Sequence, residues 1–303
     1  MKNCQRLPGQ IIQRYKWTFG TFGHKNKFTN NNIKKNTVIV ISTYEMITAC
    51  RVIQKRLARS LTTASVTFKH HGSLGDEDFG LHYVNQDGTP MSPWHDLPLR
   101  HSSSSSLFTF VNEIPRYTTA KMEIDTKQQH NPIVQDRKNG KLRHYHGPLY
   151  WNYGCIAQTW EDPNHHGDEQ VGGAGGDNDP LDVVEIGSAT IGMGEVVGVK
   201  PLGALSMIDD GELDWKLICV RGDDPLAGKL NNVHDIERLL PGTVAGIREW
   251  FRWYKTPDGK PINAFGHNED VLSLDETMKV IEDTHSQWQN LRKGTADKGK
   301  LWI

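Results

Sequence analysis

The sequence GDNDPLDVVEIG occupies residues 176–187 and decides how the rest of the chain is interpreted. Three carboxylates, Asp177, Asp179 and Asp182, fall within six residues, and the apolar segment that follows them predicts a strand. Pro180 fixes the backbone between the acids. Carboxylates this close repel one another and raise one another's pKa values, and a hard cation among their oxygens removes the repulsion. We expect Mg²⁺, which proteins typically hold with a few carboxylates, water and substrate phosphates.

A second acidic stretch, IDDGELDWK, occupies residues 208–216. Asp209 and Asp214 have the same five-residue separation as Asp177 and Asp182. The stretch lacks the alternating ligands and terminal bidentate glutamate of a calcium loop. Alone it could be a surface turn. Together with the first stretch it can supply the far side of a site for several metal ions.

Charged residues occur two apart on three predicted strands, so that each pair lies on one strand face. The pairs are Lys121 with Glu123, Lys141 with Arg143, and Asp214 with Lys216. Taken alone, each pair is explained more simply as part of a solvated strand face that carries ordinary ion pairs. All three beside the aspartates suggest one cavity for a metal-bound polyanion, in which acids hold cations and bases hold phosphate oxygens.

The secondary-structure pattern predicts strands first and helices later. Strands are expected at 107–114, 120–124, 141–145, 181–186, 195–202 and 213–220. One helix is expected from Thr243 to Tyr254. A second is expected to begin at the capping box of Ser273 and Glu276, with an apolar stripe through Leu274, Met278, Ile281, His285 and Trp288. We predict an α+β fold, mainly β, consisting of a small barrel with flanking α-helices.

Composition excludes several classes of protein. No apolar run reaches the length of a membrane span, so none is expected. The four cysteines are far apart and form no C-x-x-C pair, which argues against a zinc ribbon or a disulfide framework. Residues 62–303 hold 23 basic and 35 acidic residues, a net of −12, which makes nucleic-acid binding a poor hypothesis.

The N-terminal region has the opposite charge. Residues 1–61 contain 12 lysines and arginines and a single acid, Glu45. Residues 46–61 are basic, rich in serine, threonine and alanine, and free of acids, as mitochondrial transit peptides are. We predict a disordered basic region at 1–61 with a transit peptide at 46–61, Met46 as the start, and one domain at 62–303. A plain disordered basic tail is the alternative.

At this point the chain resembles the family I soluble inorganic pyrophosphatases of the eukaryotic type, and in particular a mitochondrial form. The matching stretches are EIPRYTTAKMEI (113–124), NPIVQDRKNGKLR (131–143), NYG (152–154), QTWEDP (158–163), the two acidic stretches and EWFRWYKTPDGKP (249–261). The resemblance covers about residues 88 to 290. It implies a five-stranded barrel of OB-like topology, a homodimer, and Mg²⁺-dependent hydrolysis of pyrophosphate. The location is predicted from the N-terminal composition alone: the mitochondrial matrix, with the cytoplasm as the alternative.

The resemblance also implies a role for each site residue. The metal ligands would be Asp177, Asp182, Asp209, Asp214 and Glu123. Asp179 would be the general base, Glu113 would support it through water, and Tyr153 would be a tyrosine of the site. The phosphate-binding residues would be Lys121, Arg143, Lys216, Tyr254 and Lys255.

One segment departs from the family pattern. Between Arg143 and Asn152 the chain reads HYHGPLYW, which is several residues shorter than usual, and Pro148 stands where a tyrosine is expected. Tyr150 is the candidate replacement for that tyrosine. A misplaced exon boundary is one explanation. A real deletion is the other, and it could move Arg143 away from the phosphate.

Two other functions compete with pyrophosphate hydrolysis. A D-x-D glycosyltransferase also holds Mg²⁺ or Mn²⁺ between carboxylates and a diphosphate, but it needs a nucleotide-binding α/β domain, and no βαβ alternation precedes Asp177. The second alternative is a catalytically impaired barrel that acts as a binding module, which the shortened segment at 143–152 makes possible. Release of phosphate from pyrophosphate separates the three.

Overall fold

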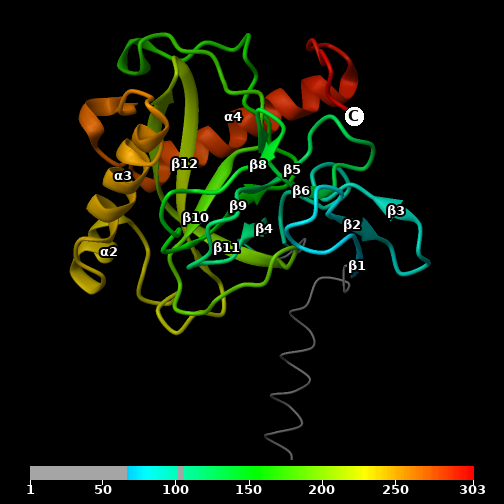
Figure 1. Ribbon diagram of the computed structural model, residues 1–303. Helices are drawn as coiled ribbons and strands as arrows, with labels where there is room; N and C mark the ends of the chain where they lie inside the picture. The colour runs from blue at the N-terminus through cyan, green and yellow to red at the C-terminus, as the bar shows by residue number, and fades with distance from the viewer. Residues whose placement is uncertain (1–66, 102–105) are drawn as a thin grey trace, which may run out of the picture. The chain divides into compact units, whose positions relative to one another are not determined.

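Five strands close into a barrel at the centre of the fold (Figure 1). The computed structural model describes residues 67–101 and 106–303. The barrel strands are β4 (Phe108–Ile114), β9 (Asn152–Ile156), β10 (Asp182–Glu185), β11 (Val196–Asp209) and β12 (Glu212–Arg221). They pair in the order β12–β10–β9–β4–β11, and β11 pairs again with β12 to complete the ring. The predicted five-stranded, OB-like barrel is confirmed.

A second sheet, which the sequence pattern did not reveal, extends the fold on its N-terminal side. It consists of β1 (Thr67–His71), β2 (Gly80–Val84), β3 (Pro90–Met91), β5 (Met122–Ile124) and β6 (Ile133–Gln135). A small hairpin pairs β7 (Arg137–Lys138) with β8 (Lys141–Leu142), and β13 (Ala264–Phe265) adds to β11. Most of these strands are too short to show a clear period of two.

The barrel wall has an apolar face on each side. Leu217 and Cys219 of β12 pack in one hydrophobic cluster with Trp215, as their spacing predicts. Ile218 and Val220, which alternate with them, pack in a second and larger cluster. Burial on both sides explains why β12 has few polar residues beyond those at its start.

Strands β4 and β9 approach closely at Gly154. A Cβ at this position would lie 2.0 Å from the carbonyl oxygen of Val111, so only glycine fits there. The register between β4 and β9 shifts nearby, between Asn112 and Ile114. The shift is a bulge that bends β4 and helps the sheet to close.

In the described part of the chain, three α-helices flank the barrel: α2 (Val233–Leu239), α3 (Thr243–Trp253) and α4 (Leu274–Lys293). The same part of the chain also forms three short 3₁₀ helices, η1 (Glu169–Val171), η2 (Thr256–Asp258) and η3 (His267–Glu269). The predicted helix over 243–254 is confirmed within one residue. The capping box of Ser273 and Glu276 is also confirmed, with both reciprocal bonds present.

The buried face of α4 differs from the predicted stripe, of which only Ile281 is fully buried. The buried residues are Thr277, Ile281, Thr284, Gln287 and Leu291. Two threonines bury their hydroxyls by donating to backbone carbonyls of their own helix. Gln287 accepts the backbone N–H of Asp162 at 2.7 Å. Since the polar groups have partners, hydropathy alone could not locate this face.

Two predicted strands have different lengths in the structure. The strand expected at 141–145 is only the two-residue β8, and Lys141 is exposed. The strand expected at 195–202 instead runs to Asp209 as β11. Asp210 and Gly211 then adopt positive φ values of 51° and 95° and turn the chain into β12. The hairpin therefore places Asp209 and Asp214 on neighbouring strands.

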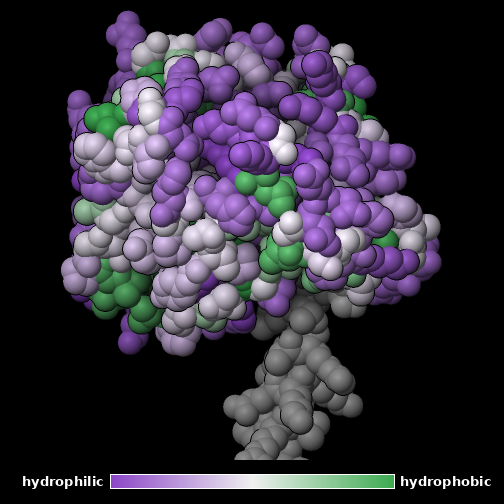
Figure 2. Space-filling model, viewed as in Figure 1, coloured by the Kyte–Doolittle hydropathy of each residue, from purple (hydrophilic) through white to green (hydrophobic). Residues whose placement is uncertain are grey.

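The predicted N-terminal region, with its transit peptide at 46–61, lies outside the described residues. Within 67–101 and 106–303, no helix combines the length and the apolar character needed to cross a bilayer. Figure 2 shows a face of the barrel domain that is covered mostly by hydrophilic residues, with small hydrophobic areas between them.

Candidate active site

One cavity of ≈ 280 Å³ at the barrel brings the predicted site residues together. Of the predicted residues, those that line it are Glu113, Lys121, Glu123, Arg143, Tyr153, Asp177, Asp179, Asp182, Asp209, Asp214, Lys216 and Tyr254. Lys255 does not line the cavity, but its ammonium donates to Asp209, which does. The cavity contains residues from β4, β9, β10, β11 and β12, so closure of the barrel is what assembles it.

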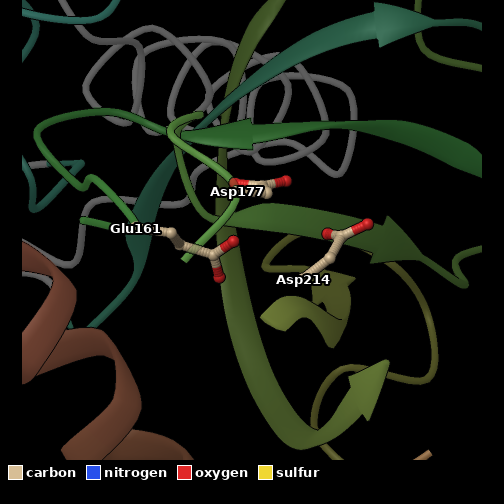
Figure 3. A group of neighbouring side chains, drawn as sticks. All are labelled: Glu161, Asp177 and Asp214. Atoms are coloured by element: carbon tan, nitrogen blue, oxygen red, sulfur yellow. The ribbon is translucent and has the colours of Figure 1, made fainter. Parts of the chain in front are cut away.

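Three carboxylates form one wall of the site, here called the carboxylate wall: Glu161, Asp177 and Asp214 (Figure 3). One oxygen from each lies within 4.8 Å of the others. Sequence analysis missed Glu161, although it lies in the QTWEDP stretch. It is 3% exposed, and its Oε2 has no hydrogen-bond partner. Gly176 allows the close approach, since a Cβ there would lie 2.4 Å from the Glu161 backbone.

Four carboxyl groups of the site, those of Glu161, Asp177, Asp179 and Asp214, hold their protons more tightly than ordinary acids. Burial is the main cause, and it raises the pKa values of Glu161 and Asp177 well above their usual range. Burial also raises the pKa values of Asp179 and Asp214 to about 7; Glu123 adds to the effect at Asp179, and Lys216 opposes it at Asp214. Asp179 lines the cavity, and its side chain is exposed to the solvent there. Such a set of oxygens fits a divalent hard cation, which would restore the ionised form.

These pKa values predict an inverted pH dependence for the metal-free protein. Asp179 and Asp214 bind protons more tightly in the folded than in the unfolded state, so their contribution to stability is lost as pH rises from about 4 to about 7. We expect the unfolding temperature in a chelator to fall across this range. Thermal unfolding followed by circular dichroism measures it. The fall in unfolding temperature should be smaller in Asp179→Asn. If the unfolding temperature of that variant had the same slope against pH, the raised pKa assigned to Asp179 would be contradicted.

Lys216 is the buried cation of the site. Its side chain is 2% exposed, and its Nζ donates to Asp182 Oδ2 and Asp214 Oδ1, each at 2.5 Å. It also donates to the Tyr153 hydroxyl at 3.0 Å, and that hydroxyl donates to Asp182. Burial opposes the charge on Lys216, but Asp182 and Asp214 outweigh burial and raise its pKa well above the usual range. The ammonium is therefore charged and held in place.

Lys121 and Arg143 form a second basic group in the lining of the cavity. Asp136, which sequence analysis missed, accepts from Lys121 Nζ at 3.0 Å and from Arg143 Nη1 at 2.9 Å. Lys121 also donates to Glu123. One carboxylate thus orients two cations. Their remaining donors are available to a phosphate group.

The shortened segment does not displace Arg143. The Arg143 carbonyl accepts the backbone N–H of Lys121 at 3.1 Å, which ties it to the start of β5. Tyr150 is 51% exposed and does not line the cavity, so it is not the replacement tyrosine. Tyr145 lines the cavity instead, and its ring packs edge-on against that of Tyr254 with 5.8 Å between the ring centroids. The prediction failed because the register of HYHGPLYW cannot be derived without its packing on α3, where Trp250 donates to the Pro148 carbonyl.

The C-terminal end of α3 supplies the last group of residues. Tyr254 donates to Asp209 Oδ2 at 2.6 Å, and its ring stacks on that of Trp250. Lys255 is 4% exposed and bridges Asp209 and Asp210. The Tyr254 hydroxyl and the Lys255 ammonium together hold Asp209 at the end of β11.

Glu113 lines the cavity, whereas Lys141 does not. Glu113 is 5% exposed, its Oε1 accepts the Ile124 backbone N–H at 2.8 Å, and burial raises its pKa well above normal. The predicted inward charge at Lys141 is wrong, because β8 ends at Leu142 and leaves Lys141 exposed.

Comparison with known proteins identifies this arrangement. The sequence profile of the family described as inorganic pyrophosphatase matches residues 110–289, which include the barrel and most of the cavity. The chain belongs to the inorganic pyrophosphatase family. The resemblance seen in the sequence is thereby confirmed at the level of the family I, eukaryotic-type enzymes, while the mitochondrial form is not.

Individual relatives agree with the family. The chain is 45% identical over 236 residues to soluble inorganic pyrophosphatase 6, chloroplastic, of Arabidopsis thaliana, covering 78% of each chain. It is 47% identical over 232 residues to the inorganic pyrophosphatase of Homo sapiens, covering 73% of this chain and 78% of that one. The crystal structure of type I inorganic pyrophosphatase from Toxoplasma gondii matches with a TM-score of 0.72 and 47% identity, over 75% of this chain and 99% of that one.

Proposed function

We propose that the cavity hydrolyses inorganic pyrophosphate to two orthophosphates. The observation that carries the proposal is that one cavity is lined both by aspartates of the two acidic stretches and by fixed lysine and arginine side chains. Acids alone would hold metal ions, and bases alone would hold an anion. Both together suit a metal-bound diphosphate, whose charge must be neutralised from several sides before a nucleophile can approach.

The family resemblance supports the assignment of the metal ligands, all of which line the cavity. Asp177, Asp182 and Asp214 would hold one Mg²⁺. Asp209 and Glu123 would hold further ions that arrive with substrate. When bound, the ions would acidify a water molecule and neutralise phosphate charge.

Asp179 would act as the general base. Its carboxyl is accessible to cavity solvent, while Asp177 beside it accepts the Asp179 backbone N–H at 3.0 Å and so fixes the loop. A base with a pKa near the operating pH transfers protons efficiently. Glu113 would support the base through water. Tyr153 would hold Asp182 in place through its hydroxyl.

The substrate-binding residues form two groups. Lys121 and Arg143, oriented by Asp136, would bind one phosphate group. Tyr254 would also bind phosphate oxygens, and Lys255, which does not line the cavity, would do so only beside Asp209, to which it donates. Lys216 would bind the leaving phosphate. Because their partners already fix most of these side chains, little conformational entropy is lost when substrate binds.

Phosphate release tests the proposal directly. Purified protein with pyrophosphate and Mg²⁺ should release two phosphates per substrate, and a chelator should abolish the release until Mg²⁺ is restored. Colorimetric phosphate measurement provides the readout. No acceptor sugar is needed, so a requirement for one would indicate the glycosyltransferase instead. Binding of Mg²⁺ and pyrophosphate without release would indicate the impaired barrel.

Location and assembly are part of the proposal. The basic, acid-poor composition of 46–61 supports import into mitochondria. We expect the mature native protein to begin near residue 62, after removal of residues 46–61, which intact-mass measurement checks. A mature N-terminus at Met46 would exclude cleavage of the transit peptide and favour the cytoplasm, and one before Met46 would exclude Met46 as the start. The family resemblance supports a homodimer and a single domain at 62–303. Sedimentation of the native protein measures the assembly.

A further inference from the structure

A second cavity of ≈ 400 Å³ lies behind the carboxylate wall. Glu161 lines this cavity, and its carboxylate also lies with those of Asp177 and Asp214. Gly176 and Leu213, the residues directly before those two aspartates, line it as well. The wall between the two cavities is therefore a single layer of residues. Nothing in the proposed hydrolysis uses the second cavity.

The body of the second cavity is apolar. Val171, Leu213, Trp215, Leu272 and Val280 contribute to its lining. These side chains come from η1, β12, the segment before α4, and α4 itself. An indole and several branched side chains on opposite sides suit a flat or aliphatic ligand, as the lining of small-molecule sites generally does.

The charges around this apolar body are mainly negative. Four acids line the cavity, Glu161, Asp168, Glu276 and Asp283, against one lysine, Lys279. Asp168 caps η1, and Glu276 belongs to the capping box of α4, so both are fixed in place. The negative electrostatic potential of these acids favours the binding of a cationic ligand and opposes the binding of an anionic one.

Glu161 provides the specific contact. Its Oε1 accepts the Trp215 backbone N–H at 3.1 Å, whereas its Oε2 is buried and has no hydrogen-bond partner. A buried carboxylate oxygen without a donor is costly, and a ligand ammonium would satisfy it.

We propose that the second cavity binds a small amphipathic organic cation, with its ammonium at Glu161 and its apolar body against Trp215, and that this binding opposes divalent-ion binding at Asp177 and Asp214. An ammonium at Glu161 and a divalent ion at Asp177 and Asp214 would repel each other, because one oxygen of Glu161 lies within 4.8 Å of an oxygen of each aspartate. By linkage, each must weaken the other by the same factor. The opposition rests on the proposed metal site, but the binding of the organic cation does not.

Calorimetric titration of the metal-free full chain with tryptamine tests the cavity. Tryptamine carries an aromatic body and one ammonium. We expect a dissociation constant below about 1 mM, and binding at least ~5-fold weaker for 3-ethylindole, which lacks the charge. No heat with tryptamine, or equal binding of the neutral analogue, would overturn the proposal.

Two neighbouring residues of α4 provide matched variants. Asp283 lines the cavity, whereas Glu282 is exposed and does not. Asp283→Asn should weaken tryptamine binding at least ~3-fold, and Glu282→Gln should leave it unchanged. Equal effects would show that tryptamine senses only the overall charge of the helix, which would contradict a site in the cavity.

A titration with tryptamine in Mg²⁺, against NaCl of matched ionic strength, tests the opposition. The apparent dissociation constant should rise at least ~3-fold, and tryptamine should weaken Mg²⁺ binding by the same factor. If Mg²⁺ alone gives no binding heat, the proposed metal site fails while the cavity stands. If both ligands bind independently, the opposition is wrong.

Discussion

Asp179→Asn is expected to lower kcat for pyrophosphate by about 10²–10⁴-fold, the usual contribution of a positioned general base. Asparagine has the same shape, so the loop that Asp177 holds through the residue-179 backbone N–H stays in place. Asn cannot accept the proton of the attacking water. Mg²⁺ uptake, measured by calorimetry, should change by no more than ~3-fold, because the ligands assigned to the first ion are retained.

Asp270→Asn is the matched control, since Asp270 is exposed and does not line the cavity. It should keep the kcat of the unmodified protein. The pH profile adds an independent readout. The acid limb of kcat should lie below about pH 7, since bound cations lower the pKa that burial raises, and it should disappear in Asp179→Asn. A variant with full turnover would remove Asp179 from the role of base.

The barrel and most of its site could be predicted because they depend on local patterns. The two acidic stretches already hold their aspartates at fixed spacing, and alternation on β12 separates Asp214 and Lys216 from the apolar face. Neither feature needs knowledge of distant contacts. Their meeting in one cavity follows from strand pairing, since Asp182 of β10 lies opposite Lys216 of β12 in the parallel register.

Other residues of the site could not be predicted, because their placement depends on contacts between distant segments. Glu161 reaches the carboxylate wall only because Gly176 packs against its backbone. Tyr145, rather than Tyr150, enters the cavity because the segment after Arg143 packs on α3. Asp136 matters because it meets Lys121 and Arg143 in space. The QTWEDP stretch was the one available signal for Glu161.

The second large effect concerns Lys216 and stability. Lys216→Met should lower the unfolding free energy of the metal-free protein by about 3–5 kcal/mol near neutral pH, the usual cost of removing one partner from a buried ion pair. Asp182 and Asp214 would then face each other without their shared cation, and the Tyr153 hydroxyl would lose its donor. Chemical denaturation in a chelator measures the loss.

Lys260→Met is the matched control, because Lys260 pairs with Asp210 at 2.9 Å but is 45% exposed. Solvent screens that pair, so its loss should cost far less stability than the loss of Lys216. Adding Asp214→Asn to Lys216→Met should recover part of the stability, since one unpaired charge is removed. The loss in Lys216→Met should also be smaller at about pH 5 than at about pH 8, because protons then replace the missing cation on Asp214. If both lysine variants cost the same and the second substitution recovers nothing, the carboxylates of this site do not depend on Lys216 for their charge balance.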